Sequence, residues 1–162
     1  TKPEEYGDYF AWGETEPKEV YYFDTYTYTS TPTRLPLSAD AANVNWGGKW
    51  RMPTKSEMEE LFNQCTWTWT KENGVYGYRV TSMIPGYTDR SIFLPAAGGR
   101  GGKNIYGIDY DGRYWSSSLN TRESSMAWCI YFVNGDMEKE IDDVSVTSIS
   151  RHNGQSIRPV CP

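Results

Sequence analysis

The fold of this chain is decided by the stretch Lys49-Trp-Arg-Met-Pro-Thr-Lys-Ser-Glu-Met-Glu-Glu-Leu-Phe-Asn-Gln-Cys65. Thr54 is a good N-cap residue, and Glu57 three positions later completes a Thr-x-x-Glu capping box. Pro53 keeps the residue before it extended, so an extended segment turns sharply into a helix. Apolar residues then recur at i, i+3, i+4 and i+7, as on one buried helix face. The stretch therefore predicts a short amphipathic helix over residues 55–65, with a buried face of Met58, Leu61, Phe62 and Cys65.

Upstream of this helix the signals are weaker. Residues 21–29 alternate Tyr with Thr and Asp, which indicates a strand or an extended segment on the surface. Residues 31–37 are rich in Pro and Thr and read as a loop. Ser38 or Asp40 is expected to cap a short helix that ends before the two glycines at 47 and 48.

Downstream, period-two patterns predict an antiparallel sheet. Residues 66–70 place Trp67 and Trp69 on one side, and a strong Asn-Gly turn signal at 73–74 leads to a partner strand over 76–80. Further strands are expected over 91–94 (stopped by Pro95), 114–118, 126–133, 137–149 and 155–161, with Asn-Gly turns at 134–135 and 153–154. Residues 96–113 contain six glycines and are expected to form no regular element, which makes them functional or mobile. The sum is an α+β fold with one main helix, one minor helix and long irregular loops.

Composition restricts the function classes. A chain of 162 residues fits a single domain, here 1–162, with a net charge of −5. No basic run occurs, so nucleic acid is not expected as a partner. No apolar run is long enough to cross a bilayer, and no signal peptide is visible, so membrane insertion is not expected. Because the chain opens at Thr1, we expect a processed piece of a longer precursor.

The aromatic content points to recognition. The chain has 13 Tyr and 7 Trp against a single His. Tyr and Trp give large contact areas at low entropic cost, which favours a binding surface over acid–base chemistry. The alternative is that these rings serve as core and cross-strand pairs of a β-rich protein.

Catalytic and metal chemistry lack their usual parts. His152 is the only His and is most simply a turn residue, so a His-based triad or zinc site is not expected. The three cysteines contain no Cys-x-x-Cys pair, and Cys129 lies in an apolar run, as a buried thiol does. No cofactor is expected. Calcium is the minor alternative, through the Asp109–Asp111 pair, which turn chemistry explains better, or through an acidic cluster that also suits a solvated edge strand. That cluster comprises Asp136, Glu138, Glu140, Asp142 and Asp143.

Four arginines divide into two expected roles. Arg51 and Arg158 sit between apolar neighbours, where a guanidinium usually braces backbone carbonyls or a buried carboxylate. Arg100 and Arg113 lie in or beside the glycine-rich segment and are expected to face a ligand.

Four short motifs carry a family resemblance: Trp-Arg-Met-Pro-Thr-Lys-Ser-Glu-Met (50–58), Phe-Leu-Pro-Ala-Ala-Gly (93–98), Tyr-Trp-Ser-Ser (114–117) and Ser-Ile-Arg-Pro-Val (156–160). The first resembles the segment leading into the helix of the formylglycine-generating-enzyme branch of the C-type lectin fold. Together they look most like the major paralogous domain family first named in Fibrobacter and common in Bacteroides-type bacteria. The matches extend over residues 7–161.

The resemblance implies a C-type lectin-like fold with twisted antiparallel sheets, in which residues 6–12 form a first strand near the C-terminal one. In that fold the first helix lies against the C-terminal strand. The resemblance therefore also implies a disulfide between Cys65 and Cys161, a pairing that the sequence itself leaves open. Formylglycine-generating enzymes use two nearby cysteines in their last segment, whereas this chain has only Cys161 there. The Glu-Pro-Asn and Trp-Asn-Asp calcium motifs of C-type lectins are absent.

We therefore expect a non-catalytic recognition or adhesion domain on a bacterial or phage surface, outside the cell, with a protein or carbohydrate as partner. Fold relatives include the variable proteins of diversity-generating retroelements, which diversify the C-terminal part of this fold. The rival hypotheses are a structural module of a fimbrial or multi-domain surface protein and, less strongly, a formylglycine-generating type of enzyme. The expected binding face comprises loops 98–113 and 118–125 with the strand ends near 134 and 151–153. Its candidate residues are Arg100, Asn104, Tyr106, Tyr110, Asp111, Arg113, Asn120, Arg122, Glu123 and His152.

Overall fold

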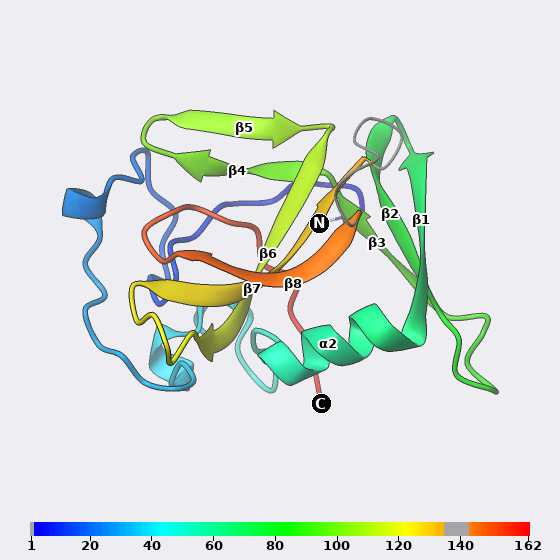
Figure 1. The fold of residues 1–162 in the computed structure, drawn as a ribbon, viewed down its shortest axis with the longest axis horizontal. Helices are drawn as coiled ribbons and strands as arrows, with labels where there is room; N and C mark the ends of the chain where they lie inside the picture. Colours follow the sequence, from blue (N-terminus) through cyan, green and yellow to red (C-terminus); the bar gives the residue numbers. More distant parts are fainter. Residues whose placement is uncertain (1, 135–142) are drawn as a thin grey trace.

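A computed structural model describes residues 2–134 and 143–162 of the chain. The α+β prediction is confirmed: the described part consists mostly of curled, mainly antiparallel sheet with two short α-helices (Figure 1). One sheet has the order β1-β2-β3, with bounds Cys65–Glu72, Val75–Ser82 and Ser91–Pro95. The other has the order β5-β4-β6-β7-β8. In chain order its strands are β4 Ala97–Gly101, β5 Asn104–Ile108, β6 Asp111–Leu119, β7 Met126–Val133 and β8 Val144–Ser150.

The main helix, α2 (Lys55–Gln64), forms as predicted. Thr54 Oγ1 accepts a hydrogen bond from the Glu57 backbone N–H at 3.2 Å, and a Glu57 carboxylate oxygen accepts one from the Thr54 N–H at 2.8 Å. Arg51 adds a bidentate contact to the same carboxylate, at 2.8 and 2.6 Å. The structural role predicted for Arg51 is therefore confirmed.

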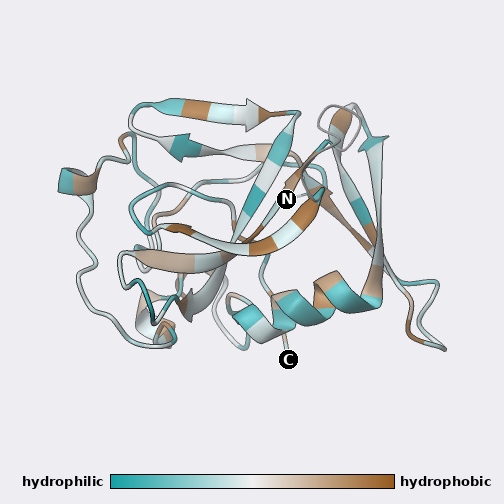
Figure 2. Ribbon diagram, in the orientation of Figure 1, coloured by the Kyte–Doolittle hydropathy of each residue, from teal (hydrophilic) through white to brown (hydrophobic). Residues whose placement is uncertain are grey.

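The predicted apolar face of α2 is only partly correct. Met58 is buried, whereas Phe62 is 40% exposed. Cys65 lies outside the helix because its backbone is extended (φ −129°, ψ 150°) and begins β1. The helix packs against the ends of both sheets, and Figure 2 shows hydrophilic and hydrophobic residues alternating along it.

We expect the Arg51–Glu57 pair to make stability depend on pH. Hydrogen bonds from Arg51 and then Thr54 lower the pKa of Glu57 from 4.5 to about 2. Because the folded pKa is the lower one, the pair stabilises the fold above the unfolded pKa, and this contribution is lost as pH falls toward 2. In urea denaturation, Glu57→Gln should lower the free energy of unfolding by about 1 kcal/mol at pH 7 and by little at pH 2. Glu59→Gln, which removes an exposed pair with Lys55, is the control; an equal loss for Glu57→Gln at both pH values would contradict the assignment.

The minor helix, α1 (Ala41–Trp46), also forms where the sequence predicts it. Asp40, 1% exposed, caps it by accepting a hydrogen bond from the Asn43 N–H. The same carboxylate accepts from the Met52 N–H at 2.9 and 3.1 Å. One buried side chain thus ties α1 to the segment that leads into α2, and α1 ends at Gly47 in a positive-φ conformation (+68°).

The β1–β2 hairpin confirms the Asn-Gly turn. Asn73 and Gly74 have φ values of +49° and +92°, which only such residues adopt readily. Trp67 and Trp69 point to the same side, and each meets the Tyr78 ring edge-on, at 5.8 and 5.2 Å between centroids. These tryptophans are half-buried and pack against the core as cross-strand pairs, as the alternative interpretation of the aromatic content allows.

The prediction that residues 96–113 contain no regular element is wrong. They form β4, β5 and the start of β6. The glycines serve close packing: the Phe132 ring occupies the space that a Cβ on Gly112 would need, and Gly98 adopts φ +63° against the Tyr106 carbonyl. Tertiary contacts therefore override the low strand propensity of Gly.

Two other predicted strands, at residues 6–12 and 155–161, are reduced to isolated bridges, and residues 21–29, predicted as a strand or an extended surface segment, form a surface segment with one bridge. Their pairs are Phe10 with Gln155, Tyr21 with Gly102, and Arg51 with Val160. A 3-10 turn, Phe23–Thr25, interrupts the segment 21–29. Of the predicted strand 137–149, the structure describes only the part from residue 143 on, which contains most of β8.

The described cysteines are all free, so the disulfide expected between Cys65 and Cys161 is not formed. The bridge between Val160 and Arg51 places Cys161 near the start of α2, whereas Cys65 follows its end. A ten-residue helix is about 15 Å long, and a disulfide needs Cα atoms within about 7 Å. Cys129 is fully buried, as predicted.

This arrangement predicts an order of thiol reactivity. Cys161 is exposed, Cys65 is half-buried, and burial raises the pKa of Cys129 to about 12. We expect a thiol reagent added to native, unreduced protein to label Cys161 first, Cys65 more slowly and Cys129 only after unfolding. Peptide mass analysis reports the sites, and Cys161→Ser should remove the fast phase. Labelling of one cysteine alone in the unfolded, unreduced chain would reveal a disulfide and contradict the prediction.

Candidate functional site

The structure divides the predicted binding face into two. Strand β6 separates the segment around Asp111 from the loop that follows Leu119. Nine residues at about 3.3 Å each put these strand ends roughly 26 Å apart. Tyr110, Asp111 and Arg113 therefore lie away from Asn120, Arg122 and Glu123.

Four segments that are distant in sequence meet at one end of the molecule. Tyr21 pairs with Gly102 at the β4–β5 turn, and Arg100 pairs with Gly154. The Arg151 N–H donates to the Ser125 carbonyl at 3.0 Å, which joins the 151–154 turn to the β6–β7 loop. These segments lie together on the left of Figure 1. We call the side chains displayed there the end surface: Tyr22, Phe23, Lys103, Asn104, Tyr106, Arg122 and His152.

The end surface displays rings beside glycine backbone. Phe23 is 78% exposed, Tyr106 53% and Tyr22 48%. The Tyr22 ring lies so close to Gly102 that a Cβ there would be 2.7 Å from Cε1. Asn104 Nδ2 donates to the Tyr106 hydroxyl at 2.9 Å and so orients that ring. Exposed rings held in fixed positions beside small residues are typical of protein recognition surfaces.

Arg151, which sequence reasoning did not single out, holds this end together. It is 5% exposed, and its guanidinium lies 4.8 Å from the Trp12 ring centroid. Its side chain donates to four oxygens: the hydroxyl of Tyr26 at 2.9 Å and the carbonyls of Ser124, Tyr28 and Ser30 at 3.0, 2.8 and 2.7 Å. In the sequence, Arg151 stands just before an Asn-Gly turn, and an arginine in that position is usually expected to be exposed.

The β6–β7 loop uses two of its predicted site residues for its own shape. Asn120 Oδ1 accepts from the Arg122 N–H, and its Nδ2 donates to Ser148 Oγ, both at 3.0 Å. Hydrogen bonds from Ser125 to Glu123 lower the pKa of that carboxyl. Arg122 is exposed and remains the loop's contribution to the end surface.

Arg100 and Arg113, expected to face a ligand, bind within the protein instead. Arg100 donates to the Lys18 carbonyl at 3.0 Å and lies over the Tyr9 and Tyr21 rings. Arg113 pairs with Asp111 at 3.2 Å and lies over the Tyr131 ring. Burial raises the pKa of Asp111, and Arg113 partly opposes that shift.

Arg158, expected to be a structural brace, has no such contact. It forms no hydrogen bond or ion pair with any residue in the described ranges. The prediction for this side chain is therefore wrong, and its half-buried charge is left facing outward into a groove.

His152 and Tyr110 occupy half-buried positions. The His152 ring meets the Phe23 ring edge-on at 6.0 Å. Burial, and then the charge of Lys18, lowers the pKa of His152. The Tyr110 carbonyl accepts from the Asn134 N–H at 3.0 Å, so the expected strand end near 134 closes the β6 end of the sheet rather than the end surface.

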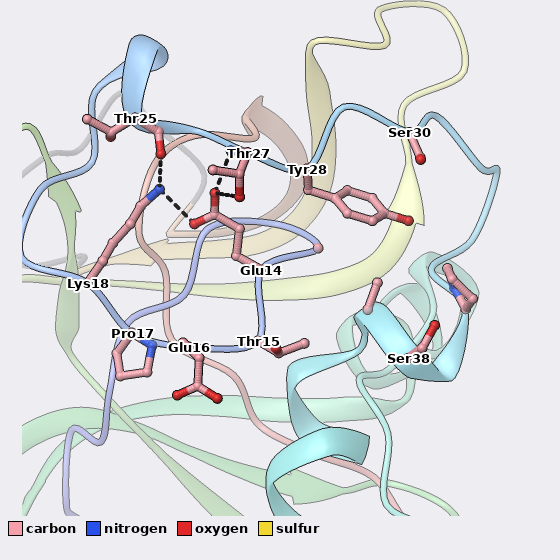
Figure 3. A pocket seen from close by; sticks show the side chains of 13 residues that line it. Glu14, Thr15, Glu16, Pro17, Lys18, Thr25, Thr27, Tyr28, Ser30 and Ser38 are labelled. Atoms are coloured by element: carbon pink, nitrogen blue, oxygen red, sulfur yellow. Dashed lines mark hydrogen bonds and ion pairs between the residues drawn. The ribbon is translucent and has the colours of Figure 1, made fainter.

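An open depression of about 680 Å³ lies between residues 13–18 and 25–30 (Figure 3). Glu14 and Lys18 point toward each other across it and pair at 2.6 Å. Lys18 also donates to the Thr25 carbonyl, and Glu14 accepts from the N–H and hydroxyl of Thr27. These polar groups form hydrogen bonds and an ion pair with one another, so the depression offers few free polar groups to a ligand.

The candidate calcium positions gain no support from geometry. In residues 2–134 and 143–162 no three His, Cys, Asp or Glu side chains gather as metal ligands do. Asp109 accepts a hydrogen bond from the Tyr6 hydroxyl at 2.6 Å. Of the predicted acidic cluster only Asp143 is described; Asp136, Glu138, Glu140 and Asp142 lie outside the described residues.

No known family, curated protein or solved structure matches the chain. Within the described residues no helix is long and apolar enough to cross a membrane.

Loss of Arg151 should unfold the end surface. Arg151→Met leaves three partly buried carbonyls without their donor and removes a buried, fully bonded guanidinium, so we expect the free energy of unfolding to fall by about 3 kcal/mol in urea denaturation. Arg151→Lys should recover only part of this, because one ammonium cannot reach all the oxygens. Arg122→Met, at an exposed arginine of the adjoining loop, should change stability by less than about 0.5 kcal/mol. Equal effects at both positions would rule out the anchoring role.

Proposed function

We propose that this chain is a non-catalytic recognition domain of a bacterial or phage surface protein, and that the end surface binds a protein partner. One observation carries the proposal: the exposed rings of Tyr22, Phe23 and Tyr106 lie on two segments that the Tyr21–Gly102 bridge joins. Arg151 holds the first of these segments through the carbonyls of Tyr28 and Ser30. Rigid rings lose little entropy on binding and supply most of the energy of such contacts.

The resemblance to the major paralogous domain family supports this proposal. In the C-type lectin-like fold that it implies, the C-terminal segment lies beside the first main helix. The backbone bridges between Val160 and Arg51 agree with such an arrangement, as does the packing of α2 on β8. Placement outside the cell follows from the same resemblance.

An enzyme of the formylglycine-generating type is less well supported. That chemistry uses two neighbouring cysteines, whereas Cys161 is exposed near the start of α2, Cys65 follows its end and Cys129 is fully buried. The other alternative, a structural module of a fimbrial or multi-domain surface protein, would leave the end surface without a ligand of its own.

A binding array separates recognition from the structural role. The labelled domain is applied to arrayed extracellular host proteins and glycans, and saturable binding is compared among three proteins. Phe23→Ala/Tyr106→Ala should lower affinity at least tenfold, because it removes the two most exposed rings of the end surface. Phe62→Ala/Tyr87→Ala removes rings that are 40% and 60% exposed elsewhere, on α2 and the β2–β3 loop, and should have no effect.

Saturable binding that resists the end-surface variant would contradict the proposed surface. If the wild-type domain binds no protein or glycan on the array, the structural role is favoured.

A further inference from the structure

A groove of about 640 Å³ lies away from the end surface, between the N-terminal segment, α1 and the segment before Cys161. Its walls include Tyr6, Trp46, Trp50 and Ile92, and Trp46 and Trp50 are 49% and 42% exposed. Exposed indoles in a concavity of this size are typical of small-ligand sites.

Two parts of the groove wall, the backbone at Trp50 and the hydroxyl of Tyr6, are held by hydrogen bonds within the protein. Asn43 Nδ2 donates to the Trp50 carbonyl at 2.8 Å and to that of Gly48 at 3.3 Å. The Tyr6 hydroxyl is held by Asp109. A preformed site binds without the entropic cost of ordering its walls.

Arg158 brings an unsatisfied charge into this groove. Its neighbours are anchored, because Ser156 and Val160 form backbone hydrogen bonds with Trp115, Arg113 and Arg51. Its guanidinium is half-buried without a hydrogen bond or ion pair among the described residues, and it is close enough to Tyr114 to oppose the burial that raises the pKa of that phenol. A partly desolvated charge without a partner is costly, so it suits a site completed by an anionic ligand group.

Among the arginines that are buried or half-buried, only Arg158 lacks a partner of this kind in the part of the chain that the structure describes. Arg51, Arg100, Arg113 and Arg151 each bind oxygen atoms of the protein. The carboxylates that share the groove with Arg158, Glu5 and Asp8, are exposed on its rim and form no ion pair with it. They remain available as acceptors for hydroxyl groups.

We propose that the groove binds an acidic saccharide, with a sugar carboxylate on Arg158 and pyranose rings stacked on Trp46 and Trp50. A guanidinium can bind a carboxylate in a bidentate manner, by donating two parallel hydrogen bonds. The C–H faces of a pyranose pack well on indole rings, and its hydroxyls pair with rim carboxylates such as Asp8. A peptide would instead need a row of free backbone partners, whereas the backbone groups of Ser156 and Val160 that flank this groove are already bonded within the protein. This inference stands independently of the protein-binding role of the end surface.

The test uses oligogalacturonate of four units as the probe, with its fully methyl-esterified form and a tetraglutamate peptide as comparisons. Isothermal titration calorimetry should show binding of the free acid, a loss of at least tenfold for the ester, and little binding of the peptide. Arg158→Gln should lower affinity for the free acid at least tenfold, and Arg158→Lys should recover only part of it. Trp50→Ala should weaken the acid and the ester alike.

Two controls keep the result specific. Arg122→Gln removes an exposed arginine elsewhere and should leave oligogalacturonate binding unchanged. Phe23→Ala/Tyr106→Ala should also leave it unchanged, so failure of the end-surface proposal is distinguishable from failure of this one. Far-ultraviolet circular dichroism confirms that each variant is folded.

No binding of the free acid, equal affinities for acid and ester, or unchanged affinity in folded Arg158→Gln would overturn the proposal. Equal binding of tetraglutamate would also overturn it and indicate a site for acidic peptides.

Discussion

Much of this structure depends on how Arg151 satisfies backbone carbonyls that no strand can reach. Residues 21–30 lie on the molecule with a single backbone bridge, so their polar groups need partners from elsewhere. The Arg151 fork supplies donors to two carbonyls of that segment and to one of the β6–β7 loop, while Trp12 covers its face. A guanidinium does this better than an ammonium because its donors are fixed in one plane. The irregular end of the molecule is therefore rigid without being regular.

The elements that the sequence predicted well are those whose signals are local. The capping box of α2, the Asp40 cap of α1 and the Asn73-Gly74 turn each involve residues within a few positions of one another. Such contacts form in any context that leaves the segment folded. The strands on either side of that turn follow from a period-two pattern, and β7 follows from a short continuous apolar run, for the same reason.

The failures have the opposite origin. Glycines at 98 and 112 look like breakers, but they are required where β4 and β6 approach other backbone or the Phe132 ring. The roles of the arginines depend on residues far along the chain, such as Lys18 for Arg100, so neighbouring sequence cannot assign them. Arg100 consequently binds a backbone carbonyl, which was the role expected of Arg158, and Arg158 has no such contact with the described residues. Strand β6 separates the two loops of the predicted binding face. No local sequence signal shows how far apart a strand will place the loops at its two ends.

Charge satisfaction offers a better guide to function in this fold than loop composition. In the depression of Figure 3, Glu14 and Lys18 neutralise each other and bind the threonines around them. In the groove, the wall backbone is equally well held, yet one guanidinium has no partner. Both hollows are similar in volume, so size does not distinguish them. A folded chain tends to pair its partly buried charges. Because Arg158 has no partner within the described part of the chain, a ligand is the partner to test for.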